Sequence, residues 1–473
     1  MRRTAALLVF PFAVTTLAAQ QPDEQVAQIA CAYTAKITAS AIFVSGRTLA
    51  SVKAQELAPT RPIEEMIRRL LQIEVDRAAQ SVTCTLGDAS ATAVFRPWLG
   101  CALVTEDVDA DELRAQQPGP LADAPAASDP EALWPDGERV DPRAADGLDR
   151  EALEQALDTA MAEPSEGPPV HTRALVVVHD GRIVGERYAD GFAADMPLPG
   201  WSMSKTLTNA LLGMRAADGE FDPTSRPRVP YWRGPRDPRT QINYGHLLAM
   251  TAGIEWDEDY ENPASDAVRM LFASTDHAAV YARKRAAARP GSRFHYASGA
   301  SNLLCRVLRA SFDDDESYWA HAQRLFRRLG MRTAVLETDP SGTFVGSSYG
   351  YASARDWARL GLLYLQDGVF AGERILPEGW VAQSTTPTEA SHGRYGWHIW
   401  LNADPAGEDA DGEAPSARRW PDLPADLYYM AGHEGQACVV SPSARLVVVR
   451  LGCTKQGAFD LAALLQRLHA ALR

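Results

Sequence analysis

The stretch Pro199-Gly-Trp-Ser-Met-Ser-Lys-Thr-Leu-Thr-Asn-Ala-Leu-Leu-Gly-Met214 decides the predicted fold. Its first two residues end a loop, and the apolar residues that follow recur at helical spacing until Asp218. Ser202 therefore lies at a helix start, and Lys205 lies one turn later on the same face. The lysine side chain can reach the serine hydroxyl, and the helix N-terminus favours negative charge on the serine oxygen. Because lysine becomes a base only when burial or a nearby cation lowers its pKa, the pattern predicts an enclosed site.

Two later segments place polar side chains beside glycines, Arg293-Phe-His-Tyr-Ala-Ser-Gly299 and Ala431-Gly-His-Glu-Gly-Gln436. Tyr296 has a reference pKa of about 10, so it carries a proton as a tyrosinate only beside a cation such as Lys205. Glycines in the later segment let a substrate approach a strand closely, and a free edge N–H can serve as an oxyanion donor. Taken alone, Tyr296 also fits a packed aromatic residue, and Gly435 fits a turn.

The three motifs together are far more specific than each one alone. Ser202-x-x-Lys205, Tyr296-x-Ser298 and His433-x-Gly435 occur in an order that resembles the three-motif pattern of the penicillin-recognising serine hydrolases. Further likeness to the class C β-lactamase branch lies in three segments, Leu247–Gly253, Ser353–Gly361 and Arg374–Trp380. The resemblance covers residues 173–473.

This resemblance implies an α/β (α+β) fold of the β-lactamase/transpeptidase type, in which helices flank an antiparallel sheet and form a helical subdomain. It implies a Ser-Lys-Tyr site without metal or cofactor, whose oxyanion donors are the backbone N–H groups of Ser202 and Gln436. Ser298 stands where β-lactamases carry Asn, and the third motif lacks their Lys-Thr-Gly cation. Both departures resemble 6-aminohexanoate-dimer hydrolase and esterase-type members. The segment 256–263 also resembles theirs, so that Tyr260 lines the acyl site, unless this segment is a solvated acidic loop.

We therefore expect a serine hydrolase that cleaves small amides or esters through an acyl-enzyme on Ser202, with Lys205 and Tyr296 as its acid–base pair. A β-lactamase or D-amino-acid peptidase of the same fold is an alternative. A second is an α/β-hydrolase esterase that uses Ser348 in Gly346-Ser-Ser-Tyr-Gly350, a motif that requires a strand before it. A third is a non-catalytic binding module on this fold.

Composition and the first residues bear on partners and compartment. The formal net charge of −14 argues against nucleic acid, because phosphate binding requires clustered Lys and Arg. Two arginines, an apolar run and small residues make residues 1–19 a predicted signal peptide, and a membrane anchor is the alternative. No later stretch is expected to span a membrane. The chain is thus predicted to be secreted or periplasmic, and the sequence indicates no oligomeric state.

The remaining pattern divides the chain. Residues 20–104 form a predicted α+β extension, with helices at 23–41 and 61–72 and strands at 81–86 and 91–104. Residues 105–149, rich in Ala, Asp and Pro, are a predicted acidic linker. In the hydrolase domain, residues 150–473, strand pairs 173–179/182–188 and 436–441/445–451 are expected to share one sheet, with a helix at 459–472 packed on it.

Six cysteines are an even number, which permits disulfides in an oxidising compartment. Three of them crowd the extension, so we expect one bridge among Cys31, Cys84 and Cys101. Cys305 lies in an apolar helical run and is expected to be a buried free thiol.

Overall fold

A six-stranded antiparallel sheet forms the centre of the computed structural model, which describes residues 24–118, 129, 131–405 and 417–472. The predicted signal peptide lies outside these residues. The strand order is β12-β13-β14-β15-β5-β6, with bounds Trp400–Leu401, Tyr428–Gly432, Gln436–Ser441, Leu446–Gly452, Thr172–His179 and Arg182–Tyr188. Because β15 pairs with β5, with Val448 opposite Val177, the two predicted hairpins share one sheet. That prediction is confirmed.

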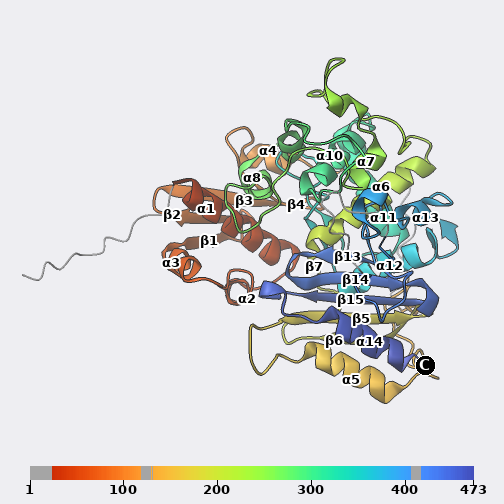
Figure 1. Ribbon diagram of the computed structural model, residues 1–473. Coiled ribbons are helices and arrows are strands. Elements are labelled where there is room, and N and C mark those ends of the chain that lie inside the picture. The colour runs from red at the N-terminus through yellow and green to blue at the C-terminus, as the bar shows by residue number, and fades with distance from the viewer. Residues whose placement is uncertain (1–23, 119–128, 130, 406–416, 473) are drawn as a thin grey trace, which may run out of the picture.

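Helices cover both faces of this sheet (Figure 1). On one face, α5 (Arg150–Met161) and α14 (Leu461–Ala471) bury Leu157 and Leu465 in one cluster with Val177 and Val448. On the other face lies α12 (Ala354–Leu365), where a Cβ added at Gly361 would fall 2.6 Å from Val447 Cγ1. Each buried Leu or Val contributes about 1.5–3 kcal/mol. The helix predicted near the C-terminus thus packs as expected.

The middle of the chain forms the helical subdomain, and α6 (Ser204–Ala217) runs through it with every residue from Ser204 to Met214 buried. Around it lie α7 (Tyr244–Leu248), α8 (Asp266–Ala273), α9 (His277–Ala282), α10 (Ser298–Arg309), α11 (Asp315–Arg328) and α13 (Trp380–Ser384). A small sheet, β7-β9-β8 (Leu198–Pro199, Gly350–Ala352, Val335–Leu336), borders the start of α6, and β10 (Val369–Phe370) pairs with β11 (Glu373–Arg374). The predicted fold class is confirmed.

The N-terminal extension is a four-stranded antiparallel sheet, β1 (Gln72–Asp76), β2 (Ser81–Leu86), β3 (Ala89–Arg96) and β4 (Gly100–Leu103), packed against α1 (Glu24–Ala39). Two short helices, α2 (Leu49–Ala54) and α3 (Pro62–Leu70), join α1 to the sheet. The strand predicted at 91–104 is wrong in one respect. It breaks after Arg96, because Pro97 has no N–H for the ladder and Trp98 adopts φ +67°.

The helix Glu24–Val44, formed by α1 and the π-helical turn Ser40–Val44, is long and apolar enough to cross a membrane. This corrects the expectation that no such stretch follows the predicted signal peptide. However, 72% of its apolar window is buried inside the structure, where it packs on β2, β3 and α8. Its apolar composition is accounted for by these contacts.

The described parts of the predicted linker pack against the folded chain. A short helix, α4 (Ala110–Ala115), buries Leu113 against β3. Farther on, the carbonyl of Gly137 accepts a hydrogen bond of 2.6 Å from Arg359, which also pairs with Glu138. Residues 119–128 and 130 lie outside the described residues. The domain boundaries at 104 and 149 stay a prediction.

All six cysteines are buried free thiols. The disulfide expected in the extension is therefore absent from the structure: Cys31 donates to the carbonyl oxygen of Ala89 at 3.6 Å, and Cys101 lies on β4. Burial raises the pKa of Cys84 and of Cys101 to about 12, which keeps both thiols protonated at neutral pH. Cys305 is a buried free thiol, as predicted.

Candidate active site

The turn that carries Ser202 is held in a conformation that costs free energy. Trp201 adopts φ +48°, the left-handed region that a bulky residue rarely occupies, and a 3-10 turn, Trp201–Met203, leads into α6. Ser204 Oγ donates to the carbonyl of Trp201 at 2.6 Å and accepts from the N–H of Gly350 at 2.8 Å. These bonds fix the turn and leave Ser202 half-buried at its apex.

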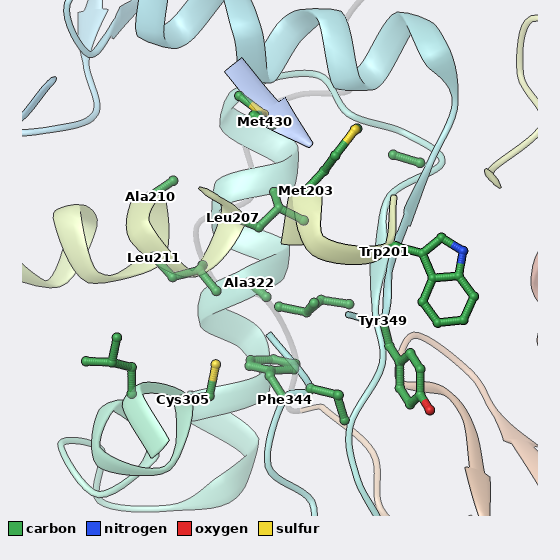
Figure 2. Packing of buried hydrophobic residues seen from close by; sticks show 14 of the residues in the cluster. Trp201, Met203, Leu207, Ala210, Leu211, Cys305, Ala322, Phe344, Tyr349 and Met430 are labelled. Atoms are coloured by element: carbon green, nitrogen blue, oxygen red, sulfur yellow. The ribbon is translucent and has the colours of Figure 1, made fainter. Parts of the chain in front are cut away.

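Apolar packing supports the same turn. In Figure 2, Met203 and Leu207 lie inside the buried cluster, while the indole of Trp201 lies beside the ring of Tyr349. The centroids of these two rings are 6.4 Å apart. The serine turn therefore packs against Tyr349, the residue just before β9.

Lys205 has three polar neighbours and is 1% exposed. Its Nζ lies 3.0 Å from Ser202 Oγ, 3.1 Å from Ser298 Oγ and 3.0 Å from the carbonyl oxygen of Ser347. Burial lowers the pKa of Lys205 to about 8, and the charge of Glu258 acts in the opposite direction. A substantial fraction of the amine is thus neutral near pH 7 to 8.

Tyr296 reaches the same serine from the other side. Its hydroxyl hydrogen-bonds Ser202, the ammonium of Lys205 lies 4.7 Å from its ring centroid, and its ring stacks on Trp400 at 5.4 Å. Burial, and then the charge of Glu258, raise the pKa of Tyr296 well above its usual range. The tyrosinate, which the sequence made conditional on a nearby cation, is therefore disfavoured, and this environment favours a neutral phenol that can pass a proton on.

Glu258 is the site residue that sequence reasoning missed. Its carboxylate accepts hydrogen bonds from the backbone N–H of Ser298 at 2.8 Å and from Tyr260 at 3.0 Å, and it also accepts from the hydroxyl of Ser298 and the indole of Trp256. The sequence analysis chose the segment 256–263 because of Tyr260 and overlooked Glu258. The position of Glu258, two residues before that tyrosine, was the one available signal. The segment is a wall of the site, not a free acidic loop.

The third motif is a turn rather than a straight strand. His433 packs its ring between Trp201, at a centroid distance of 5.5 Å, and Tyr260, at 5.8 Å. The residue keeps an exposed edge, yet this packing desolvates the ring and lowers its pKa, so it is neutral at pH 7. Glu434 adopts φ +60°, is 8% exposed and pairs with Lys455, so its charge is held in an ion pair.

Gly435 and Gln436 have mainly structural contacts. Gly435 has φ +80°, and a Cβ there would fall 2.7 Å from Arg450 Nη1, so this glycine serves the turn. The side chain of Gln436 is buried, donating to the carbonyl of Gly452 at 2.7 Å and accepting from its N–H at 2.9 Å. The backbone N–H of Gln436 stays a predicted oxyanion donor, as does that of Ser202.

Gly432, one of the two glycines of the third motif, sets how closely β13 approaches the serine turn. A Cβ at this position would fall 2.1 Å from the carbonyl oxygen of Gly200. Real Cβ atoms do not come within 3.0 Å of a backbone atom, so only glycine fits without moving the strand. This close approach brings the third motif against the start of α6.

Ser348, the nucleophile of the α/β-hydrolase alternative, is 2% exposed. Its hydroxyl hydrogen-bonds that of Ser347 at 2.8 Å. The central sheet is antiparallel, whereas a nucleophile elbow follows a strand of a parallel α/β sheet. The structure contradicts this alternative.

Among the described residues, no group of three or more His, Cys, Asp or Glu side chains is placed to hold a metal ion. The expectation that the reaction needs no metal or cofactor stays a prediction.

Fold and site together define a serine hydrolase with a β-lactamase-type architecture. The chain belongs to the β-lactamase family, whose sequence profile matches residues 157–472. The predicted family and enzyme class are thereby confirmed. The N-terminal extension lies outside the matched residues.

Similar proteins cover parts of the chain. It is 27% identical over 232 residues to the 6-aminohexanoate-dimer hydrolase of Paenarthrobacter ureafaciens, a match over 44% of this chain and 56% of the relative. The chain thus spans little more than half the length of that relative. A proposed 6-aminohexanoate-dimer hydrolase from Bacillus anthracis superimposes with a TM-score of 0.53 at 20% identity, covering 70% of this chain and 85% of that one. EstCE1, a hydrolase with promiscuous acyltransferase activity, gives 0.51 at 16% identity over 68% and 98%. At these identities the two structures show a shared fold.

Proposed function

We propose that this chain hydrolyses small linear amides or esters through an acyl-enzyme on Ser202. The three hydrogen-bond partners of Lys205 Nζ are the main support for this proposal. A neutral amine has two N–H donors and one lone pair. Since the carbonyl of Ser347 can only accept, and the hydroxyl of Ser298 donates to Glu258, these two neighbours take the N–H donors. The lone pair is left for the hydroxyl proton of Ser202, 3.0 Å away.

In the first half-reaction, Lys205 takes the proton of Ser202 while Oγ forms a bond to the substrate carbonyl carbon. The proton then passes through the neutral phenol of Tyr296 to the leaving nitrogen or oxygen, whose bond to carbon breaks. In the second half-reaction, the same pair removes a proton from water, whose oxygen attacks the ester carbon. The bond between that carbon and Ser202 Oγ then breaks, the acid product leaves, and the pair returns the proton to Oγ. The oxyanion is stabilised by the backbone N–H groups of Ser202 and Gln436.

The third motif favours short-chain esters or small linear amides over β-lactams. A β-lactam carboxylate needs a cation at this position, and His433 is neutral because desolvation lowers its pKa. Among the described residues near the motif, Lys455 pairs with Glu434, and Arg450 donates to the carbonyls of Val170 and Gly435. Neither cation is free to bind a carboxylate. The name of the Paenarthrobacter relative favours small amides among the candidate substrates.

The test compares p-nitrophenyl butyrate, a linear 6-aminohexanoate-type amide and a chromogenic cephalosporin with purified protein. We expect clear turnover of the ester or the amide and slow or absent turnover of the cephalosporin. Efficient cephalosporin turnover with negligible cleavage of the other two would favour the β-lactamase alternative. D-amino-acid peptides belong in the same panel, because the D-peptidase alternative predicts that they react fastest. No reaction with any of these substrates, and no labelling of Ser202, would favour the non-catalytic binding module.

We also propose that the mature protein begins near residue 20 and is secreted or periplasmic. The order of charged, apolar and small residues at 1–19 supports this. N-terminal sequencing of protein recovered from the cell exterior or periplasm tests it. Recovery from the cytoplasm alone, with Met1 retained, would contradict it.

A further inference from the structure

The N-terminal extension reaches the active site through a buried ion pair. Lys36 on α1 is 2% exposed, and its Nζ lies 2.5 Å from a carboxylate oxygen of Glu337, which is fully buried. The other oxygen of Glu337 accepts from Ser40 Oγ at 2.8 Å and from the backbone N–H of Cys101 at 2.6 Å. All three donors belong to the extension. Glu337, a residue of the hydrolase domain, is thus bound by its side chain to the extension.

Glu337 in turn holds the loop that contacts Lys205. Its backbone N–H donates to the carbonyl of Tyr349 at 3.0 Å, and its carbonyl accepts from the N–H of Val345 at 2.9 Å. Between these two anchors lies Ser347, whose carbonyl oxygen is one of the three neighbours of Lys205 Nζ. A continuous path of short contacts therefore runs from α1 to the catalytic amine.

The same lysine also touches the wall behind the nucleophile. Lys36 Nζ lies 3.9 Å from the ring centroid of Tyr349, whose ring lies beside Trp201 (Figure 2). The next residue, Gly350, donates its N–H to Ser204 and accepts from the N–H of Gly200 at 2.8 Å. The segment that Lys36 holds is thus bonded on both sides of Ser202.

A second contact from the extension reaches the third motif. Lys455, which pairs with Glu434, donates to the backbone carbonyl of Glu56 at 3.3 Å. The carboxylate of Glu56 accepts from Arg173 on β5 at 2.6 Å. The extension therefore contacts two separate walls of the site, one behind Lys205 and one behind His433.

We propose that the extension positions the catalytic groups, and that Lys36 and Glu337 are positioning residues for the reaction proposed above, on which this inference rests. The matched family domain begins at residue 157, so the three donors to the Glu337 carboxylate come from outside it, whereas Ser347 itself is bonded within it, through its N–H to Asn302 at 3.1 Å. Buried polar networks position groups only when every member is satisfied, and the Glu337 carboxylate has its partners on the extension. Loss of the bonds between Glu337 and the extension loosens the loop that carries the Ser347 carbonyl, the acceptor that faces Lys205.

The test uses variants that avoid leaving a lone buried charge. Lys36→Met/Glu337→Met replaces the pair with apolar groups of similar size, an exchange that buried ion pairs often tolerate. Lys36→Met/Glu337→Gln also removes both charges, but its amide oxygen can still accept from Cys101 and Ser40. Lys53→Met is the matched control, because Lys53 is an exposed lysine of the same extension. The readout is the pH dependence of the rate at which a fluorophosphonate labels Ser202, with the melting temperature measured alongside.

We expect Lys36→Met/Glu337→Met to fold, to be labelled about tenfold more slowly, and to show a labelling midpoint at lower pH, because the Lys205 ammonium loses an acceptor. Lys36→Met/Glu337→Gln should be labelled within about threefold of the wild-type rate, and Lys53→Met should match the wild type. A folded Met/Met variant with the wild-type profile, or equal impairment of both double variants, would overturn the proposal.

Ser40→Ala keeps the proposal testable if the Met/Met variant does not fold. It removes one of the three bonds to Glu337, and we expect labelling to slow about two- to threefold with little change in melting temperature. An unchanged labelling rate would contradict the proposal. If wild-type protein is not labelled at Ser202, the proposed function itself fails; if wild type and all variants are labelled alike, only the positioning role fails.

Discussion

Glu258→Gln removes the charge that opposes the lowering of the Lys205 pKa. The carboxylate and the ammonium are separated by one hydroxyl, that of Ser298, which is 3.1 Å from Nζ and hydrogen-bonded to Glu258. Charges about 5 Å apart at an effective dielectric constant of about 20 interact by roughly 3 kcal/mol, or about two pH units. Glu258 is half-buried rather than buried, and solvent screening reduces this to about one unit.

The sign follows from the role of Lys205 as a base. The reaction needs the neutral amine, so the rate rises with pH through the pKa of Lys205, which is about 8 in the wild type. Without the Glu258 charge the ammonium is less stabilised, the pKa falls, and the midpoint of the rising limb moves to about pH 7. The plateau also falls several-fold, because a weaker base removes the serine proton less readily.

The assay is kcat/KM for p-nitrophenyl butyrate from pH 5.5 to about 9, followed at the isosbestic wavelength of the product. Glu261→Gln is the matched control: it makes the same charge change three residues away, on a side chain that is 82% exposed, and should leave the midpoint unchanged. A midpoint that stays in place or rises in Glu258→Gln would refute the reasoning, as would an equal shift in the control.

Three further predictions concern the groups around Ser202. Lys205→Arg should lose activity by about 10³-fold, nearly as much as Lys205→Ala, because a guanidinium stays protonated; steady-state kinetics of the purified variants checks this, and an active Lys205→Arg would refute the base role. Tyr296→Phe should lower kcat by about 10²- to 10⁴-fold, and a near-normal kcat would show that the phenol carries no proton. Gly432→Ala should lower kcat/KM by at least about tenfold, since its Cβ would fall 2.1 Å from the carbonyl oxygen of Gly200. Gly245→Ala is the control, because the nearest atom to its Cβ lies at 3.4 Å, and it should keep its activity. Equal activities of the two variants would contradict this prediction.

The sheet could be predicted because its signals are local. Asp180-Gly181 marks a tight turn between the two runs of residues that form β5 and β6, and both residues of the turn adopt positive φ. The break after Arg96 was missed although Pro97, which cannot donate to the ladder, marks it in the sequence. The membrane-like composition of Glu24–Val44 was likewise uninformative alone, since only the packing of β2, β3 and α8 decides what buries it.

At the site, the sequence identified the groups whose spacing is fixed by one element, such as Ser202 and Lys205 on successive turns. It missed Glu258, and it missed the contact of Gly432 with the serine turn, because these roles depend on contacts between segments far apart in the chain. Tyr296 lies beside Ser202, whereas the sequence left its protonation state conditional on a nearby cation. Burial and the charge of Glu258 set that state, and neither can be deduced from a motif.

The central claim is that Ser202 is the nucleophile, and a covalent phosphonate adduct tests it most directly. Purified protein is treated with a fluorophosphonate, the intact mass is measured, and the modified peptide is sequenced by tandem mass spectrometry, with Ser202→Ala treated in parallel. We predict a single adduct on Ser202 and none on the folded Ser202→Ala variant. An adduct on Ser348, or an equal adduct on Ser202→Ala, would contradict the account.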